Sequence, residues 1–589
     1  MNQRTFTSLA AFAAAMALVP AAAQAAEIET ALVSRASGFD GVPSGAFSGD
    51  PSVSADGRFV AFSSQANGLS DADDDNVLNV FVRDRATGTT ELISKGAGVP
   101  ANGDAAAPQI TPDGRYVAYL SEASNISAAD DNIAQDAYVY DRVTGTTTYA
   151  SRADGINGAA SVQGAASLSI SDDGTKVAFS SQSDNLSNLD DNTAGNVYVR
   201  DLVAGTTELV SMDGAQGGDD DSGEPAISGD GTDVAFTSDA TNLAGGGAPN
   251  FADVYVRNLV NDTTTLVSRP TGFNAVVGDG HSKAPAISHS GRFVAFQTGA
   301  DNLVDTDNDA VNWKVLRRDT FLGQTVLVSR ATGANGTPNN NQASTPEISA
   351  NGAIVAFDSF AQLDPAAVPG VNNVYTRDIA GSTTTLMSRA TGPDGEGVDV
   401  NTFGHALSAD GQTVAFATSA NNVTPEDLGG IADVFVRGLS IDPIVPPQGG
   451  GGGGGGGQAE EPVVEQPQPQ PEQPVGGGEI TVPVDTSAGS ALAPKLRMKL
   501  MRLTGTKAKV RVTCVAGDCR GTLRLQRVKG QGSKRLGRAA FAVPAGAEQT
   551  VTVRLKRSAA KPKVRATAVV KPAGAAKTVV AKTLRLKRA

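Results

Sequence analysis

Seven stretches of this chain share one pattern of apolar, small and polar positions. Each begins with a short apolar segment, passes through a glycine that follows Asp, Asn or Ser, and ends in an apolar–Ala–aromatic triplet. In a strand the outer residues of the triplet lie on one face and the alanine on the other. The pattern therefore predicts two strands joined by a tight turn. The copies are PSVSADGRFVAF (51–62), PQITPDGRYVAY (108–119), SLSISDDGTKVAF (167–179), PAISGDGTDVAF (225–236), PAISHSGRFVAF (285–296), PEISANGAIVAF (346–357) and ALSADGQTVAF (406–416).

Two further phrases follow each copy and predict a third and a fourth strand. The first resembles VYVRD and occurs at 80–84, 137–141, 197–201, 254–258, 315–319, 374–378 and 434–438. The second resembles TTLVSR and occurs at 89–95, 146–152, 206–212, 263–269, 324–330 and 383–389. Apolar character on both faces requires a partner on each side of every four-stranded sheet. Seven such sheets stacked around a ring make an all-β, seven-bladed propeller.

The seventh repeat lacks its fourth phrase, which occurs instead near the start of the chain as TALVSR (30–35). An N-terminal strand that completes the last blade would join the two ends of the ring and remove an exposed sheet edge. We therefore predict that the propeller spans 27–443 and is closed by its N-terminal strand.

The repeat unit PxxSxDGxxVAF…VYVRD resembles the WD40-like repeats of TolB-type bacterial propellers over roughly residues 28–440. The resemblance implies the propeller fold. It does not select one function, because such propellers serve both as binding platforms and as appendages of peptidases.

The N-terminus has the three parts of a secretory signal peptide. Arg4 precedes a short apolar stretch from Leu9 to Val19, and Ala23-Gln24-Ala25 forms a small-residue cleavage site. The apolar stretch is shorter than the ~20 residues that a membrane-spanning helix needs. We therefore expect a signal peptide over 1–26 and a secreted protein, extracellular or periplasmic, with no transmembrane segment after cleavage.

Composition changes sharply after the propeller. Nine glycines (449–457) and a Pro/Gln/Glu-rich stretch predict a disordered linker over 444–489. Residues 490–589 carry 26 lysines and arginines against two acidic residues, whereas the whole chain has a net charge of −14. Apolar and basic residues alternate in this tail, as in KLRMKLMRL (495–503), which predicts a small basic β-sandwich.

The tail suggests its own chemistry. Its only aromatic residue is Phe541, so it offers no stacking platform and we expect no nucleic acid partner. An anionic cell-envelope polymer, or the acidic propeller of the same chain, is the expected partner of the basic strands. The only cysteines, Cys514 and Cys519, predict a structural disulfide across a turn, because export allows oxidation.

The long loops of the propeller are acidic and lie on one predicted face. They read SDADDDNVLN (70–79), AADDNIAQD (128–136), NLDDNTAGN (188–196), GGDDDSGEP (217–225) and VDTDNDAVN (304–312). Alternating carboxylates at Asp71, Asp73 and Asp75, and at Asp305, Asp307 and Asp309, are candidate Ca²⁺ ligands. Two alternatives stay open. The loops form solvated Asx turns at strand ends, where Asn79 and its equivalents bond the backbone, or their charge attracts a cationic partner or protein ligand.

Catalytic chemistry is sparse. His281 and His405 are expected in loops of the acidic face and His289 in a turn of the opposite face, and no GxSxG or HExxH motif occurs. The recurring Arg-Asp pairs, such as Arg83-Asp84, are interpreted as turn and inter-blade ion pairs, and Trp313 as a packing residue. The sequence favours a monomeric, exported, non-enzymatic binding or scaffold protein. The alternative is an extracellular hydrolase or lyase acting on polysaccharide or peptide.

Overall fold

The computed structural model describes residues 28–439, apart from 73–76, 131, 190–192, 215, 245–246, 248–249, 273–275, 305–312, 393 and 427–429, together with the strands between 495 and 585. The chain divides into two compact units, 1–450 and 451–589. The described residues form strands, bridges, turns and bends, so the all-β prediction is confirmed. They contain no helix long and apolar enough to cross a membrane. The predicted domain boundaries near residues 26, 443 and 489 fall outside the described residues and stay predictions.

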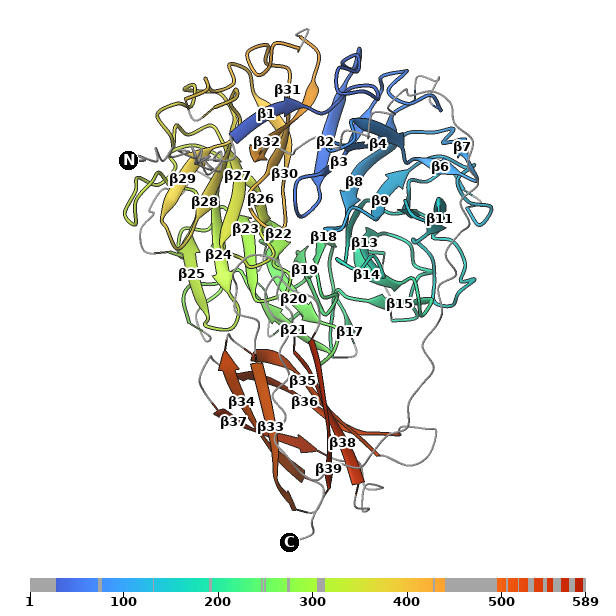
Figure 1. The fold of residues 1–589 in the computed structure, drawn as a ribbon, viewed down its shortest axis with the longest axis vertical. Coiled ribbons are helices and arrows are strands. Elements are labelled where there is room, and N and C mark those ends of the chain that lie inside the picture. Colours follow the sequence, from blue (N-terminus) through green and yellow to red (C-terminus); the bar gives the residue numbers. More distant parts are fainter. Residues whose placement is uncertain are drawn as a thin grey trace, which may run out of the picture. The chain divides into compact units, whose positions relative to one another are not determined.

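The first unit consists of seven four-stranded antiparallel sheets arranged in a ring, as predicted (Figure 1). Blade 1 comprises β2 (Ser48–Val53), β3 (Phe59–Ser64), β4 (Asn79–Asp84) and β5 (Thr89–Leu92), and blade 2 comprises β8 (Ala105–Ile110), β9 (Tyr116–Ser121), β10 (Asp136–Asp141) and β11 (Thr146–Tyr149). Blade 3 comprises β12 (Ser167–Ile170), β13 (Lys176–Ser181), β14 (Asn196–Asp201) and β15 (Thr206–Leu209). Blade 4 comprises β18 (Ser222–Ile227), β19 (Asp233–Ser238), β20 (Asp253–Asn258) and β21 (Thr263–Leu266).

Blades 5 and 6 follow the same order, and blade 7 combines the two ends of the propeller sequence. Blade 5 comprises β22 (Ser282–Ile287), β23 (Phe293–Thr298), β24 (Lys314–Asp319) and β25 (Gln324–Leu327). Blade 6 comprises β26 (Ala343–Ile348), β27 (Ile354–Ser359), β28 (Asn373–Asp378) and β29 (Thr383–Leu386). Blade 7 comprises β30 (Thr402–Leu407), β31 (Val414–Thr418), β32 (Asp433–Leu439) and β1 (Ile28–Leu32).

Strand β1 closes the ring. It pairs antiparallel with β32 from Ile28 opposite Leu439 to Leu32 opposite Phe435. Beyond the pairing, the Ser34 hydroxyl donates a 2.5 Å hydrogen bond to the Asp433 carboxylate. The predicted N-terminal closure is confirmed.

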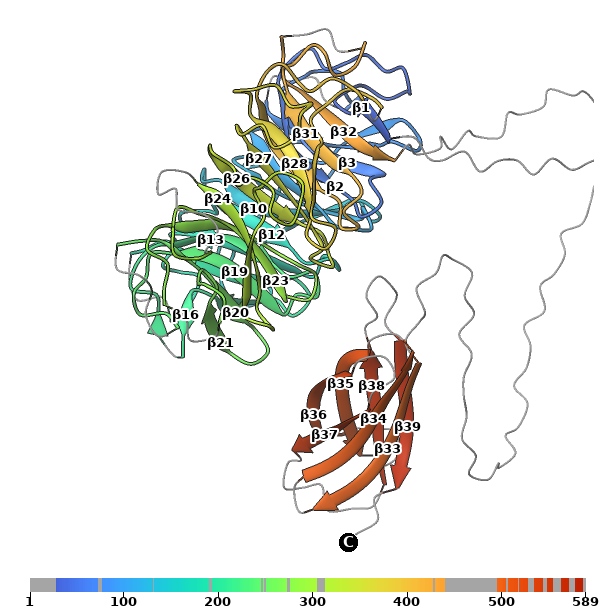
Figure 2. The ribbon, with the colours of Figure 1, turned by 90° about the vertical axis from the view of Figure 1, so that its left-hand side faces the viewer.

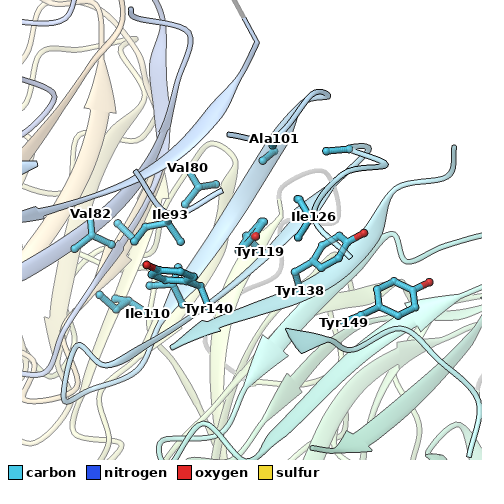
Figure 3. Packing of buried hydrophobic residues seen from close by; sticks show 14 residues of the cluster. Val80, Val82, Ile93, Ala101, Ile110, Tyr119, Ile126, Tyr138, Tyr140 and Tyr149 are labelled. Atoms are coloured by element: carbon cyan, nitrogen blue, oxygen red, sulfur yellow. The ribbon is translucent and has the colours of Figure 1, made fainter. Parts of the chain in front are cut away.

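The core lies between neighbouring blades, because each sheet packs on both faces. In blade 1, Ala61 packs towards blade 2, while Val60 and Phe62 pack towards blade 7. This is the division that the apolar–Ala–aromatic triplet predicts. Figure 3 shows the layer between blades 1 and 2, where Val80 and Val82 meet Tyr119 and its neighbours. Alanine on one face allows the next sheet to approach closely, and the aromatic residue on the other fills the wider space.

Two features of the propeller are not evident in the repeat pattern. Six of the seven first strands contain a bulge where a residue has positive φ, at Asp50, Ala107, Glu224, Ala284, Thr345 and Gly404. Two-stranded ribbons also extend blades 1 and 3, formed by β6 (Lys95–Gly96) with β7 (Val99–Pro100) and by β16 (Met212–Asp213) with β17 (Gln216–Gly217).

The second unit contains two antiparallel sheets (Figure 2). One consists of β33 (Lys495–Thr504), β34 (Lys507–Ala516) and β37 (Glu548–Arg554). The other consists of β36 (Lys534–Val543), β35 (Cys519–Arg527), β38 (Lys563–Val570) and β39 (Thr578–Arg585). Cys514 lies on β34 and Cys519 begins β35, so the predicted disulfide would link the two sheets. The structure does not describe these side chains, and the disulfide stays a prediction.

Candidate functional site in the propeller channel

The first strands of the seven blades surround the central channel, since each contacts the first strand of its neighbours. We call the end where these strands begin the upper mouth and the end at the following tight turns the lower mouth. A cavity of about 160 Å³ lies within the channel. Its wall includes one apolar side chain from every blade: Val53, Ile110, Ile170, Ile227, Ile287, Ile348 and Leu407.

Glu347 is an exception in this wall. It lies on β26, and the equivalent positions of the other blades hold Ser52, Gln109, Ser169, Ala226, Ala286 and Ala406. The side chain is half-buried and lines the cavity. No described residue donates a hydrogen bond to its carboxylate or forms an ion pair with it. Burial raises the pKa of Glu347 to about 7, because water no longer solvates the charged form fully.

A pair of side chains crosses the lower mouth. His289 of blade 5 and Asp172 of blade 3 form a hydrogen bond between Nδ1 and a carboxylate oxygen. They meet above Gly229 of blade 4, where an added Cβ would collide with both groups. The turns are also joined through the backbone, since the His289 N–H donates to the Ala350 carbonyl at 3.0 Å. The predicted position of His289 in a tight turn is confirmed, whereas the repeat pattern gave no sign of its partner.

Aromatic and basic side chains lie near the upper mouth. The rings of Phe47 and Phe403 stack with centroids 6.0 Å apart, although each side chain is nearly 40% exposed (38% and 39%). In blade 5 the ammonium group of Lys283 lies 5.0 Å from the ring centroid of Trp313. Phe403 and Lys283 occupy equivalent positions, at which the other blades carry Gly, Ala or Ser. Trp313 is therefore half-buried beside a cation and is not only a packing residue.

The prediction that His405 lies in a loop is wrong. His405 lies on β30, at the position that proline occupies in five other blades. Its Nε2 atom is buried and has no hydrogen-bond partner among the described residues. Burial lowers the pKa of His405, because the charged imidazolium loses its contact with water. The negative charge of Asp358 acts in the opposite direction but is the smaller effect. The Asp358 carboxylate accepts hydrogen bonds from Ser344, Thr345 and Asn372, and no hydrogen bond joins it to the His405 ring among the described residues.

His281 is placed as predicted, in the loop before β22, and it is exposed. Its Nδ1 atom accepts a 2.9 Å hydrogen bond from the Ala252 N–H, and its ring packs edge-on against Phe251. The histidine therefore has a structural role in joining two loops.

The interpretation of the recurring Arg-Asp residues as turn and inter-blade ion pairs is wrong for the arginines, which reach across blades to carbonyl groups instead of carboxylates. In blade 6, the Arg377 guanidinium donates to the carbonyls of Ala331 and Gly333, at 2.9 and 3.0 Å, in the loop that leaves blade 5. The equivalent arginines that bond carbonyls in this way are Arg83, Arg200, Arg257, Arg318 and Arg437. The aspartates pair instead within their own blade, as Asp84 does with Arg58 at 2.8 Å. The arginines therefore join blades through the backbone.

The Asx residues that begin the third strands are not solvated turn residues, contrary to one of the sequence interpretations. Asn79, Asp136, Asn196, Asp253, Asn373 and Asp433 are buried. Each accepts a hydrogen bond from a serine two residues beyond the end of the adjacent fourth strand, as Asn79 does from Ser94 at 2.5 Å. Blade 5 differs, because Lys314 occupies this position and pairs with Asp301 at 2.8 Å. These polar groups hold the fourth strand in place.

Of the six candidate calcium ligands, only Asp71 lies among the described residues, and it is exposed. Asp73, Asp75, Asp305, Asp307 and Asp309 lie outside them. The described residues contain no group of three His, Cys, Asp or Glu side chains that could hold a metal. Elsewhere in the acidic loops, carboxylates have local partners: Asp130 accepts from the Tyr138 hydroxyl at 2.7 Å, and Asp221 from the Gly195 N–H at 2.7 Å. The calcium site stays a prediction.

No family model and no curated protein matches this chain. Many solved structures do, at low identity. A protein from Agrobacterium tumefaciens assigned as TolB is 14% identical, and the match covers 67% of this chain and 91% of that one at a TM-score of 0.29. The periplasmic gluconolactonase PpgL of Pseudomonas aeruginosa is 15% identical over 60% and 90% of the chains, with a TM-score of 0.31. Dipeptidyl peptidase 4 of Porphyromonas gingivalis is 13% identical over 63% and 56%, with a TM-score of 0.34.

A TolB protein is thus among the matches, in keeping with the repeat resemblance. The matched proteins also include enzymes, and identities of 13 to 15% transfer no activity. The seven-bladed propeller itself is established by the strand pairing described above. The function has to be argued from the residues of this chain.

Proposed function

We propose that this chain is an exported, non-enzymatic binding protein that holds its ligand at the upper mouth of the propeller channel. The observation that carries the proposal is the presence of two accessible side-chain pairs at this end of the propeller, Phe47 with Phe403 between blades 1 and 7 and Lys283 with Trp313 on blade 5. Most polar groups that recur from blade to blade are used internally by the fold. Side chains that depart from the repeat and stay accessible are therefore free to contact a ligand.

The chemistry of the mouth suits a ligand with flat apolar surfaces and acidic or polar groups. Exposed aromatic side chains provide much contact area with few rotatable bonds, and they are enriched where proteins bind partners. The lysine adds a positive charge to a face whose loops are otherwise acidic. A protein segment or a cell-envelope polymer would satisfy both features.

The hydrolase or lyase alternative has less support. Of its candidate histidines, His281 already accepts a backbone N–H, and Asp358 beside His405 is occupied by three donors. General acid–base catalysis needs a positioned pair within reach of one substrate atom. The described residues bring no such pair together around these histidines.

The ends of the chain complete the proposal. A signal peptide over 1–26 would direct the protein to the periplasm or the exterior, and the basic strands of 490–589 would bind an anionic envelope polymer. The flexible composition of 444–489 would allow the two domains to bind separately. Alternatively, the lysines and arginines of the tail would bind the acidic loops of the propeller instead of an envelope polymer.

The proposal is tested with the full chain on arrays of cell-wall glycans and peptides, with hydrolysis followed in parallel. We expect saturable binding without turnover, weakened at least tenfold in the double variant Phe47→Ala/Phe403→Ala. Phe321→Ala is the matched control, because Phe321 is an exposed aromatic residue (67% exposed) in a tight turn after β24. Saturable turnover that is lost in His405→Ala would establish the enzyme alternative instead.

A further inference from the structure

We infer that the channel cavity binds a primary ammonium group carried on a small apolar body, with Glu347 as its counter-ion. The cavity lies deeper in the channel than the aromatic mouth, so the inference goes beyond the proposed function. Either one can fail while the other holds.

The first argument concerns size and wall chemistry. The cavity of about 160 Å³ is bounded by the seven apolar side chains from Val53 to Leu407 and by the polar residues Ser52, Gln109, Asp172, His289 and Glu347. An engineered cavity of about 150 Å³ in another protein accommodates benzene. The volume therefore suits a group of up to six or seven carbon atoms, and the mixed wall suits one that also carries a polar group.

The second argument concerns the unpaired carboxylate. Glu347 is half-buried in the wall of this cavity, and no described residue bonds its carboxylate. Holding an ionised carboxylate in such surroundings costs free energy unless a cation or hydrogen-bond donor compensates it. A bound ammonium ion would supply both. Gln109, whose exposed side chain also lines the cavity, offers an additional acceptor oxygen.

The third argument concerns the sign of the charge. The charged or titratable residues that line the cavity are Glu347, Asp172 and His289. Asp172 and His289 bond each other, which leaves Glu347 as the carboxylate without a partner. An anionic ligand would meet repulsion, and a hard metal ion would need more oxygen ligands than one carboxylate supplies. A compact ammonium ion needs only one strong counter-ion and room for its carbon chain.

A pair of side chains covers part of the lower mouth. Asp172 and His289 meet above Gly229, so they cover the side of this opening that blades 3 to 5 form. The ammonium group could belong to a free amine or to a lysine side chain of a peptide.

The test is isothermal titration calorimetry of the full chain at pH 8 with benzylamine, n-butylamine, benzyl alcohol and benzoate. We expect saturable binding of the amines, at least tenfold weaker binding of benzyl alcohol, and none of benzoate. Glu347→Gln, which keeps the shape of the side chain, should weaken amine binding at least tenfold. Glu122→Gln, at an exposed glutamate of the loop after β9, should bind as the unmodified protein does. Nα-acetyl-lysine amide, in a separate titration, distinguishes a lysine side chain from a free amine.

Unchanged amine binding by folded Glu347→Gln would overturn the inference, as would equal affinity for benzyl alcohol or the absence of amine binding. Ala350→Leu, which would fill the lower part of the cavity, provides a second variant and should also reduce binding at least tenfold. The double variant Phe47→Ala/Phe403→Ala separates the two sites. It should lose the ligand of the upper mouth and keep the amine.

Discussion

The outer and inner strands of the blades use their polar residues in opposite ways. On the third and fourth strands, the Asx–Ser hydrogen bonds and the arginine–carbonyl hydrogen bonds recur around most of the ring, and their groups are buried. On the first strands, the blades differ, with Glu347, Phe403, His405 and Lys283 each present once. The outer strands thus supply interactions that most blades share. On the first strands, the side chains that occur in a single blade lie in the channel or at its upper mouth.

This difference explains why the most repetitive residues are poor guides to function. A polar side chain that recurs in six blades makes the same hydrogen bonds within the fold in each of them. A side chain that occurs in only one blade is not required by this repeated structure. Substitutions in the two regions should therefore have different consequences.

The largest effect is expected from removing the closing strand. Deleting residues 28–35 would leave β32 as an exposed edge and uncover the contacts of Leu32 and Val33, which are 6% and 1% exposed. We expect the melting temperature of the full chain to fall by about 10 °C or more. A synthetic peptide of residues 27–37 added in trans should restore part of the loss. An unchanged melting temperature would show that ring closure does not contribute to stability.

A smaller effect is expected from one arginine of the outer strands. Arg377→Met removes hydrogen bonds to Ala331 and Gly333 and leaves these partly buried carbonyls without the buried guanidinium as donor. The free energy of unfolding should fall by about 3 kcal/mol. Arg58→Met is the control, since Arg58 is 34% exposed and its ion pair with Asp84 should contribute about 1 kcal/mol or less. Urea denaturation of both variants measures the difference, and equal losses would contradict the distinction.

The channel predicts a dependence on pH. Because the pKa of Glu347 is raised to about 7 from an ordinary value of 4.5, the folded protein holds this proton more tightly than the unfolded chain does. The resulting stability is complete below about pH 4.5 and is lost as the pH rises through 7. Glu347→Gln should remove this loss, so that its free energy of unfolding rises by on the order of 2 kcal/mol relative to that of the unmodified protein between pH 5 and pH 8. Urea denaturation of both proteins at pH 5 and at pH 8 measures the difference. The same change in the free energy of unfolding for both proteins would refute the prediction.

The smallest effect is expected in the acidic loops. Because carboxylates of these loops such as Asp130 and Asp221 already have local partners, we expect the melting temperature to be the same in millimolar Ca²⁺ and in EDTA. A bound ion would instead stabilise the folded state in proportion to the logarithm of its concentration. A rise of several degrees in Ca²⁺, lost in the triple variant Asp71→Asn/Asp73→Asn/Asp75→Asn, would establish the calcium site.

The repeat pattern was sufficient to predict the fold of the propeller. It gave the four strands of each blade, the number of blades and the closing strand. It also assigned Ala61 and Phe62 to opposite faces, because alternation along a strand depends only on backbone geometry. The bulges of the first strands are a local departure from that geometry. The proline that follows the positive-φ residue in five blades was a signal for them, but it reads equally well as the start of a strand.

The candidate site was predicted only in part. His405 was assigned to a loop because the repeat offers proline at that position, and the register that places it on β30 comes from the bulge. Glu347 was visible as the one acidic residue among the seven equivalent positions, in PEIS where two other copies read PAIS. What could not be read from the sequence is that no residue in the described part of the chain pairs with it. The partners of a side chain depend on packing between blades, as the bond between Asp172 and His289, two blades apart, also shows.

The pairing of β1 with β32 also constrains how this protein is made. Ser34 donates and accepts hydrogen bonds with residues about 400 positions later in the chain. During synthesis, β1 emerges before the rest of the propeller and has no partner until nearly the whole propeller sequence has followed. Contacts this distant in sequence form slowly. The strand must therefore be kept from aggregating while it waits, and the short, mostly polar segment that follows it, SRASGFDG (34–41), suits that interval.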